Sequence, residues 1–110
     1  MTSSTKYEFL CIVPDKPGAL AKRLEVRGQH LEEVKPLVAG GSVLMGGAMF
    51  ESHAAEGQTP AFKGSALLLM AESEEKAREA LSQDIYSKTG VWDLENAQII
   101  PFKCAVRTGM

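Results

Sequence analysis

The sequence has little of several features that mark specialised protein classes. Its 110 residues include two cysteines, two histidines and one tryptophan, and aromatic residues make up only 6%. Cys11 and Cys104 form no CxxC pair and lie within apolar runs, so we expect free thiols in a reducing compartment rather than a disulfide. No His, Cys or Asp spacing suits a structural zinc site, so no metal is expected.

Long apolar runs and a strong charge of either sign are also missing. No run approaches the roughly 20 residues of a membrane span, and the formal net charge is −2. These features argue against nucleic acid or a membrane as partner. The opening MTSSTKYEF lacks the basic start and apolar middle of a signal peptide, so we expect a cytoplasmic location. Neither glycine pair has the context of a phosphate-binding loop, and no cofactor is expected.

What is present is the composition of one ordinary globular domain. Hydrophobic residues make up 45% of the chain and charged residues 24%, which is typical of a soluble domain with its own core. We expect a single domain over residues 1–110. Its ends, Met1–Lys6 and Thr108–Met110, are expected to be flexible.

The longest patterned segment runs from Pro17 to Gly41 and predicts one amphipathic helix. Proline suits a first helical turn, and the Gly40-Gly41 pair is a stop signal. At 100° per residue, one stripe is apolar and is predicted to be buried: Leu20, Leu24, Leu31, Val34 and Val38.

The remaining elements follow from β-forming runs and turn signals. Strands are predicted at Tyr7–Val13, Ser42–Phe50 and Phe62–Ala71, and Trp92–Val106 carries a last strand with its strongest signal at Ala97–Ala105. A second helix is predicted to follow a Ser73 cap and to end near Gln83-Asp84, with Ile85–Gly90 as a turn-rich connection. Pro101 predicts an edge position or a bulge in the last strand. The polar segment Glu51–Pro60 predicts a long loop of the kind that often binds ligands.

This order of elements, β-α-β-β-α-β, predicts a ferredoxin-like α+β fold. Its antiparallel sheet would carry both helices on one face. The other face would then expose apolar strands, which a second copy of the chain would cover by packing sheet against sheet. We therefore expect a homodimer that forms a dimeric α+β barrel.

His30 is the first candidate for chemistry. It shares one shoulder of the long helix with Arg23 and Arg27, at i, i+4, i+7 spacing. An imidazole can act as a general acid and base near neutral pH, although a partly exposed helical histidine without a role fits the spacing equally well. A catalytic imidazole needs a carboxylate to orient it. Asp84 stands out because it ends the second helix outside any charge run, but periodicity alone does not bring it to His30.

Other residue types would suit a small-molecule site. Arg23 and Arg27 either pair with nearby glutamates or bind an anion, since guanidinium groups match carboxylates and enolates. Gly46-Gly47 within a strand marks a bulge or a place where a ligand approaches the backbone. Tyr86 and Trp92 would supply an aromatic wall, with core packing as the alternative for Trp92.

Five segments appear in an order that resembles a known family. They are DKPGALAKRLEVRGQHL at Asp15–Leu31, Leu44–Gly47, Phe62–Ser65, Asp84–Tyr86 with Gly90–Trp92, and Pro101–Lys103. In these segments the chain resembles the YCII (YciI-like) proteins, small dimeric α+β barrels related to muconolactone isomerases. It departs from the family pattern at Gly28 and Ile85, where the family often has proline.

The resemblance implies a catalytic His–Asp dyad at His30 and Asp84, with Arg27 as the arginine of the family's R-x-x-H motif. Family members of known reaction move protons without a cofactor, including dehydrochlorination and isomerisation, on cyclic or aromatic-derived small molecules. The expected function is therefore a cofactor-independent isomerase or lyase with a small-molecule substrate. The expected substrate-binding residues are Arg23, Arg27, Gly46, Gly47, Tyr86 and Trp92.

Two alternatives stay open at this point. The same barrel architecture hosts cofactor-free monooxygenases, which need dioxygen. VPDKPGALAK also resembles the opening of an ACT domain, a ferredoxin-like amino-acid sensor, although that match stops near Lys22 while the YCII match continues. The second alternative is therefore a binding module without catalysis, either ACT-like or a degenerate YCII protein.

Overall fold

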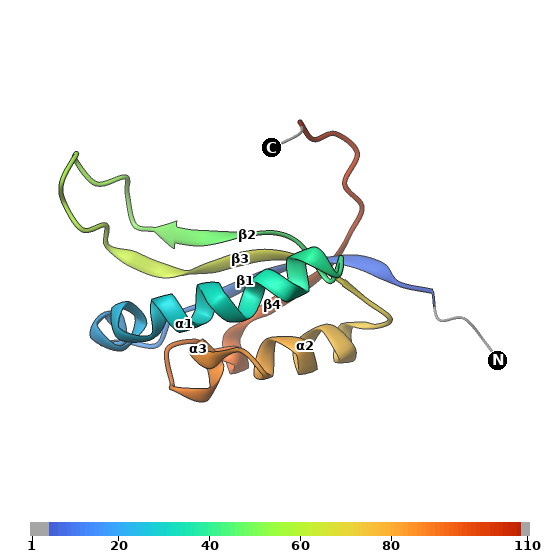
Figure 1. Ribbon diagram of the computed structural model, residues 1–110, viewed down its shortest axis with the longest axis horizontal. Helices are drawn as coiled ribbons and strands as arrows, with labels where there is room; N and C mark the ends of the chain where they lie inside the picture. Colours follow the sequence, from blue (N-terminus) through green and yellow to red (C-terminus); the bar gives the residue numbers. More distant parts are fainter. Residues whose placement is uncertain (1–4, 109–110) are drawn as a thin grey trace.

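The chain folds into a four-stranded antiparallel sheet with helices against one face (Figure 1). The computed structural model describes residues 5–108. The strands are β1 (Tyr7–Pro14), β2 (Val43–Phe50), β3 (Phe62–Ala71) and β4 (Gln98–Phe102). The helices are α1 (Leu20–Ala39), α2 (Glu74–Ser82), the short α3 (Ile85–Lys88) and a 3₁₀ turn, η1 (Leu94–Asn96). The ends expected to be flexible, Met1–Lys6 and Thr108–Met110, lie largely outside the described residues.

The strand order is β2-β3-β1-β4, and every neighbouring pair is antiparallel. This is the ferredoxin-like arrangement that the element order predicts. Strand β4 is an edge strand, which confirms the edge position expected from Pro101. Gly46 and Gly47 pair in register with β3, and the irregularities of β2 lie at its two ends instead.

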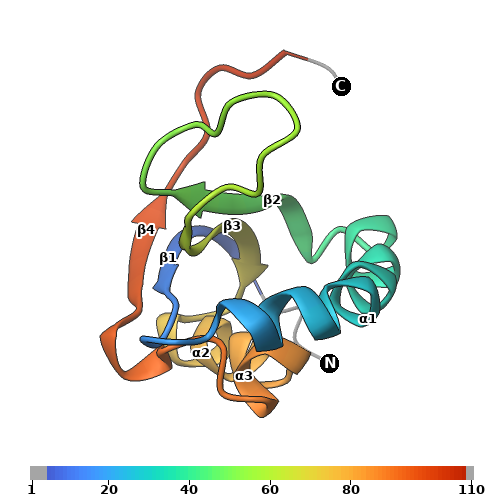
Figure 2. The ribbon, with the colours of Figure 1, turned by 90° about the vertical axis from the view of Figure 1, so that its left-hand side faces the viewer.

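Strand alternation divides the sheet into a covered face and an open face. Figure 2 shows the helices on one side of the sheet, and the core lies between the two layers. Its strand residues include Phe9, Cys11, Val13, Leu67, Leu69 and Ile99. The open face presents Met45, Ile100 and Phe102, which are 49%, 38% and 42% exposed. The expected uncovered apolar face is therefore present in the single chain.

Helix α1 buries a different face from the one that the sequence predicts. It begins at Leu20 rather than Pro17 and ends at Ala39, just before the predicted glycine stop. The predicted burial of the leucine stripe is wrong for the single chain, because four of its members are 42% to 53% exposed: Leu20, Leu24, Leu31 and Val38. The buried residue of α1 is Arg23, at 2%. The helix is rotated so that its arginine shoulder, rather than its leucines, faces the sheet.

The segment after α2 contains more structure than predicted. Ser73 caps α2 as expected, since its hydroxyl accepts the Lys76 backbone N–H at 3.1 Å. The predicted turn at Ile85–Gly90 is instead the helix α3, because the Asp84 carboxylate accepts the Tyr86 backbone N–H and starts a helical turn. The last strand is also shorter than predicted. Within residues 5–108, no helix is long and apolar enough to cross a membrane.

Candidate active site

His30 and Asp84, 54 residues apart in the sequence, meet in the structure. His30 lies midway along α1, and Asp84 is the N-cap of α3. The Nδ1 atom of His30 lies 2.9 Å from Asp84 Oδ1, and each side chain is only 14% exposed. The same carboxylate oxygen accepts the Tyr86 backbone N–H at 2.9 Å, which fixes its position. Because a carboxylate only accepts, neutral His30 carries its proton on Nδ1 and leaves Nε2 as the basic nitrogen.

Two aromatic rings hold the imidazole of His30 in place. Tyr86 stacks on it with ring centroids 4.1 Å apart and planes 16° apart, and Trp92 meets it edge-on at 6.0 Å. Both aromatic residues are 2% exposed. Burial raises the pKa of Tyr86 above its ordinary value of 10.0, against the opposing effect of nearby arginines, so its hydroxyl stays protonated at neutral pH. The imidazole therefore has one fixed orientation between α1 and α3.

Arg23 is bound mainly by the protein itself. Its Nε and Nη2 atoms donate to the two carboxylate oxygens of Asp15 at 2.7 and 3.0 Å, and Nη2 also donates to Ser65 Oγ at 2.8 Å. Its guanidinium carbon lies 4.7 Å from the ring centroid of Tyr86 and 5.1 Å from that of Phe62. A bidentate pair of this kind fixes the guanidinium plane. Arg23 thus holds its neighbours in position, although it also borders the cavity described below.

Ser65, on β3, has an unusual set of hydrogen bonds. Its buried Oγ accepts from Arg23 Nη2 and from Trp92 Nε1, the latter at 3.1 Å. Two accepted bonds fill the acceptor capacity of a hydroxyl, and nothing within residues 5–108 accepts the hydroxyl proton. This proton is therefore available to a ligand.

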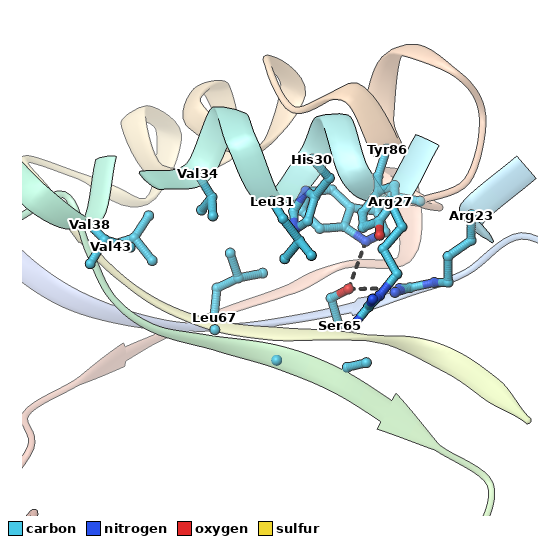
Figure 3. A pocket seen from close by; sticks show the side chains of 14 residues that line it. Arg23, Arg27, His30, Leu31, Val34, Val38, Val43, Ser65, Leu67 and Tyr86 are labelled. Carbon is cyan, nitrogen blue, oxygen red and sulfur yellow. Dashed lines mark hydrogen bonds between the residues drawn. The ribbon is translucent and has the colours of Figure 1, made fainter. Parts of the chain in front are cut away.

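These groups converge on one cavity of about 280 Å³ between α1 and the sheet (Figure 3). Seven predicted site residues line it: Arg23, Arg27, His30, Gly46, Gly47, Tyr86 and Trp92. Asp84 lies behind His30 and does not line this cavity. Arg27 is exposed and has no ion-pair partner in the described part of the chain, and Figure 3 shows it beside Arg23 at the cavity.

The loop at Glu51–Pro60 contributes no lining residue to this cavity. Nearly all of it is exposed, and it extends beyond the end of the sheet (Figure 1). The hypothesis that it closes over a substrate therefore stays a prediction. Across residues 5–108, no three His, Cys, Asp or Glu side chains are grouped in a way that would hold a metal ion.

Sequence reasoning missed Ser65 and Asp15 as parts of this site. Both residues lie inside segments that carry the family resemblance, and this was the signal that could have pointed to them. Their local patterns, however, indicate only a turn at Asp15 and the start of a strand at Ser65. Only the fold shows that Asp15, at the end of β1, binds Arg23 on α1 and thereby orients Ser65 on β3.

The fold and the site define a small ferredoxin-like α+β protein in which a histidine bound to a carboxylate faces a cavity sized for a small molecule. The chain belongs to the YCII family, since the YCII-related domain model matches residues 7–103. The first of the two resemblances found in the sequence is thereby confirmed.

Similar proteins come from fungi and bacteria. The chain is 42% identical over 103 residues to fusaric acid biosynthesis protein 2 of Gibberella moniliformis, covering 94% of this chain and 98% of that protein. It is 32% identical over 95 residues to protein YciI of Escherichia coli, covering 86% of this chain and 95% of the other.

A solved structure with the same fold is similar to this chain. It is the 5-chloro-2-hydroxyhydroquinone dehydrochlorinase TftG of Burkholderia phenoliruptrix in complex with 2,5-dihydroxybenzoquinone. The TM-score is 0.74 at 24% identity, and the match covers 89% of this chain and 95% of the other.

Proposed function

We propose that this protein is a cofactor-independent lyase or isomerase that acts on a small cyclic or aromatic-derived intermediate of secondary metabolism or catabolism. The observation that carries the proposal is the 2.9 Å contact between His30 and Asp84 at the wall of a cavity. The names of a biosynthesis relative and of a dehydrochlorinase with the same fold support it.

In this proposal, His30 Nε2 removes a proton from a carbon next to a carbonyl. The electron pair of the broken C–H bond forms a C=C bond, and the carbonyl π electrons move to oxygen to give an enolate. In the lyase version, the enolate re-forms its carbonyl, and its C=C electrons form a new C=C bond to the next carbon as the bond from that carbon to the leaving group breaks. The group leaves as chloride, with the His30 proton passing to solvent, or as water that takes this proton. In the isomerase version, protonated His30 returns the proton to a different carbon.

Two donors are suited to stabilise the enolate oxygen. Arg27 carries a guanidinium without an ion-pair partner among the described residues, one helical turn before His30. Ser65 offers a hydroxyl proton whose acidity is increased by the bond that its oxygen accepts from cationic Arg23. Donors fixed before the reaction stabilise developing charge without reorganising. Asp84 holds His30 in the tautomer with Nε2 unprotonated and stabilises the imidazolium that forms.

Chloride release from 5-chloro-2-hydroxyhydroquinone, the compound in the name of the structural neighbour, tests the proposal. We expect His30→Ala to lower kcat by roughly 10²–10⁴-fold, the usual contribution of a general base. Asp84→Asn should lower kcat while keeping the circular dichroism spectrum. His53→Ala is the matched control, because the other histidine of the chain lies in the exposed loop and should be dispensable. Normal turnover by both dyad variants would contradict the proposal.

The monooxygenase alternative differs in its need for dioxygen. An enzyme that only transfers protons turns over at the same rate under nitrogen as in air. A rate that falls to zero without dioxygen would assign the cavity to oxygenation instead.

A further inference from the structure

A second cavity, of about 250 Å³, adjoins the first and has no role in the proton transfer. It lies between α1, α2 and the sheet, and four side chains line both cavities: Val34, Val43, Leu67 and Trp92. The two spaces therefore share a wall of apolar side chains. Asp84 lines the second cavity while its partner His30 lines the first, so the dyad lies beside the same boundary.

The walls of the two cavities differ in chemistry. The first contains the donors Arg27 and Ser65, whereas the second is walled largely by apolar side chains such as Leu37, Leu69, Ala71 and Leu81. Of its charged members, Lys6, Glu72 and Lys76 are solvent-exposed, and Asp84 is bound to His30. A polar substituent placed there would lose hydration and gain few partners, whereas a hydrocarbon would gain free energy from burial.

We propose that the second cavity binds an alkyl substituent carried by the ring that His30 deprotonates. The inference rests on the proposed function, and it defines the substrate class further, as an oxygenated ring with an aliphatic side chain. The oxygenated ring lies against Arg27 and Ser65 in the first cavity, and the chain passes Val34 and Trp92 into the second.

A homologous series of ligands tests this inference. The probes are 2,5-dihydroxybenzoquinone and its 3-methyl, 3-propyl and 3-pentyl derivatives, with binding followed by quenching of Trp92 fluorescence. Trp92 is the only tryptophan of the chain and lines both cavities. We expect the Kd to fall by about fourfold for each methylene that enters an apolar cavity. A Kd that stays constant or rises along the series would overturn the inference.

Two phenylalanine variants locate the alkyl site. Ala80→Phe places a ring at an exposed position of α2 that borders the second cavity, and should remove the dependence on chain length. Ala39→Phe, at an exposed position of α1 that borders neither cavity, is the matched control and should keep it. If the Kd stops depending on chain length in both variants, or in neither of them, the inference is overturned.

The remaining outcomes separate this inference from the proposed function. Chain-length dependence is a property of binding, so it should persist in His30→Ala even though turnover is lost. If His30→Ala turns over normally while the dependence persists, the proton-transfer proposal fails and the alkyl site stands. Hexanoate carries a chain without the ring, and binding as tight as that of the 3-pentyl quinone would overturn the inference in favour of a separate fatty-acid site. Absence of binding by every quinone would overturn both.

Discussion

Arg23 and Arg27 lie one helical turn apart on α1 but have different surroundings. Arg23 is buried against Asp15 and Ser65, whereas Arg27 is exposed and has no ion-pair partner within residues 5–108. Arg23→Met should lower the free energy of unfolding by about 3–5 kcal/mol, because it leaves the Asp15 carboxylate buried without its partner. Urea denaturation followed by circular dichroism measures this loss.

Arg27→Met is the matched variant and should have the opposite pattern. Its free energy of unfolding should stay within about 0.5 kcal/mol of the wild type, since an exposed side chain without partners is removed. Its Kd for anionic 2,5-dihydroxybenzoquinone should rise by about 10–100-fold through loss of a charged hydrogen bond. Equal destabilisation by the two variants would contradict the roles assigned to them.

The buried thiol of Cys11 makes the stability of the fold depend on pH in the alkaline range. Complete burial raises the pKa of its thiol from 9.0 to about 11. Between these values the unfolded chain loses this proton while the folded chain keeps it, so stability falls as pH rises from about 9 to about 11. Below pH 9 the thiol is neutral in both states and contributes no slope.

Urea unfolding of wild type and Cys11→Ala at pH 8 to 10.5 measures this effect. The stability of Cys11→Ala should fall less steeply above pH 9 than that of the wild type. Cys104→Ala is the control, because Cys104 is only partly buried and its removal should leave the slope as it is. Parallel curves for wild type and Cys11→Ala would show that the thiol ionises alike in both states.

At the level of elements, Gly64 allows β3 to pass close to β1. A Cβ atom at this position would lie 2.3 Å from the Val13 carbonyl oxygen and 3.0 Å from Pro14 Cα, both backbone atoms that cannot move aside cheaply. Gly64→Ala should therefore destabilise the protein by about 1–3 kcal/mol, the usual cost of overpacking. Because Ser65 follows directly, ligand binding should weaken as well.

Gly28→Ala is the matched control within α1. A Cβ atom there meets nothing within 4 Å, and the residue is exposed in the middle of a helix. The substitution should stabilise the protein by about 0.5–1 kcal/mol, because alanine has the higher helix propensity. Thermal unfolding of the two variants should show a lower melting temperature for Gly64→Ala and a higher one for Gly28→Ala. An unchanged melting temperature for Gly64→Ala would show that β1 and β3 can move apart without cost.

The sequence was sufficient to predict the order and type of the main elements because their signals are local. The strand Phe62–Ala71 and the Ser73 cap depend only on neighbouring residues, and both were predicted correctly. The buried face of α1 was not, because Arg23 finds Asp15 and Ser65 only after the chain has folded. Helical periodicity distinguishes apolar from polar faces. It cannot foresee that a buried arginine will find one partner just after β1 and another on β3.

Several residues of the candidate site were named from the sequence, but its geometry was not. Family resemblance named His30 and Asp84, and the structure brings them within hydrogen-bonding distance. The stacking of Tyr86 on His30, the double acceptance by Ser65 and the second cavity all arise from contacts between distant segments. No spacing along the chain encodes such contacts.

At the scale of the whole molecule, two apolar surfaces stay exposed in the single chain. One is the open sheet face with Met45, Ile100 and Phe102, and the other is the leucine stripe of α1. We expect a homodimer at micromolar concentration that buries the sheet face. In light scattering, Ile100→Asp should give a monomer, whereas Leu24→Asp on the helix stripe should stay dimeric. A monomeric wild type, or a monomer produced only by Leu24→Asp, would contradict sheet-to-sheet packing.

The central claim is that Asp84 holds His30 as a base with Nε2 free. Nitrogen-15 NMR of the imidazole in His53→Gln, where His30 is the only histidine, tests it most directly. The account predicts that neutral His30 carries its proton on Nδ1, and that Asp84→Asn shifts the tautomer balance toward Nε2–H. A neutral His30 that already carries its proton on Nε2 in the presence of Asp84 would have no base to offer and would contradict the account.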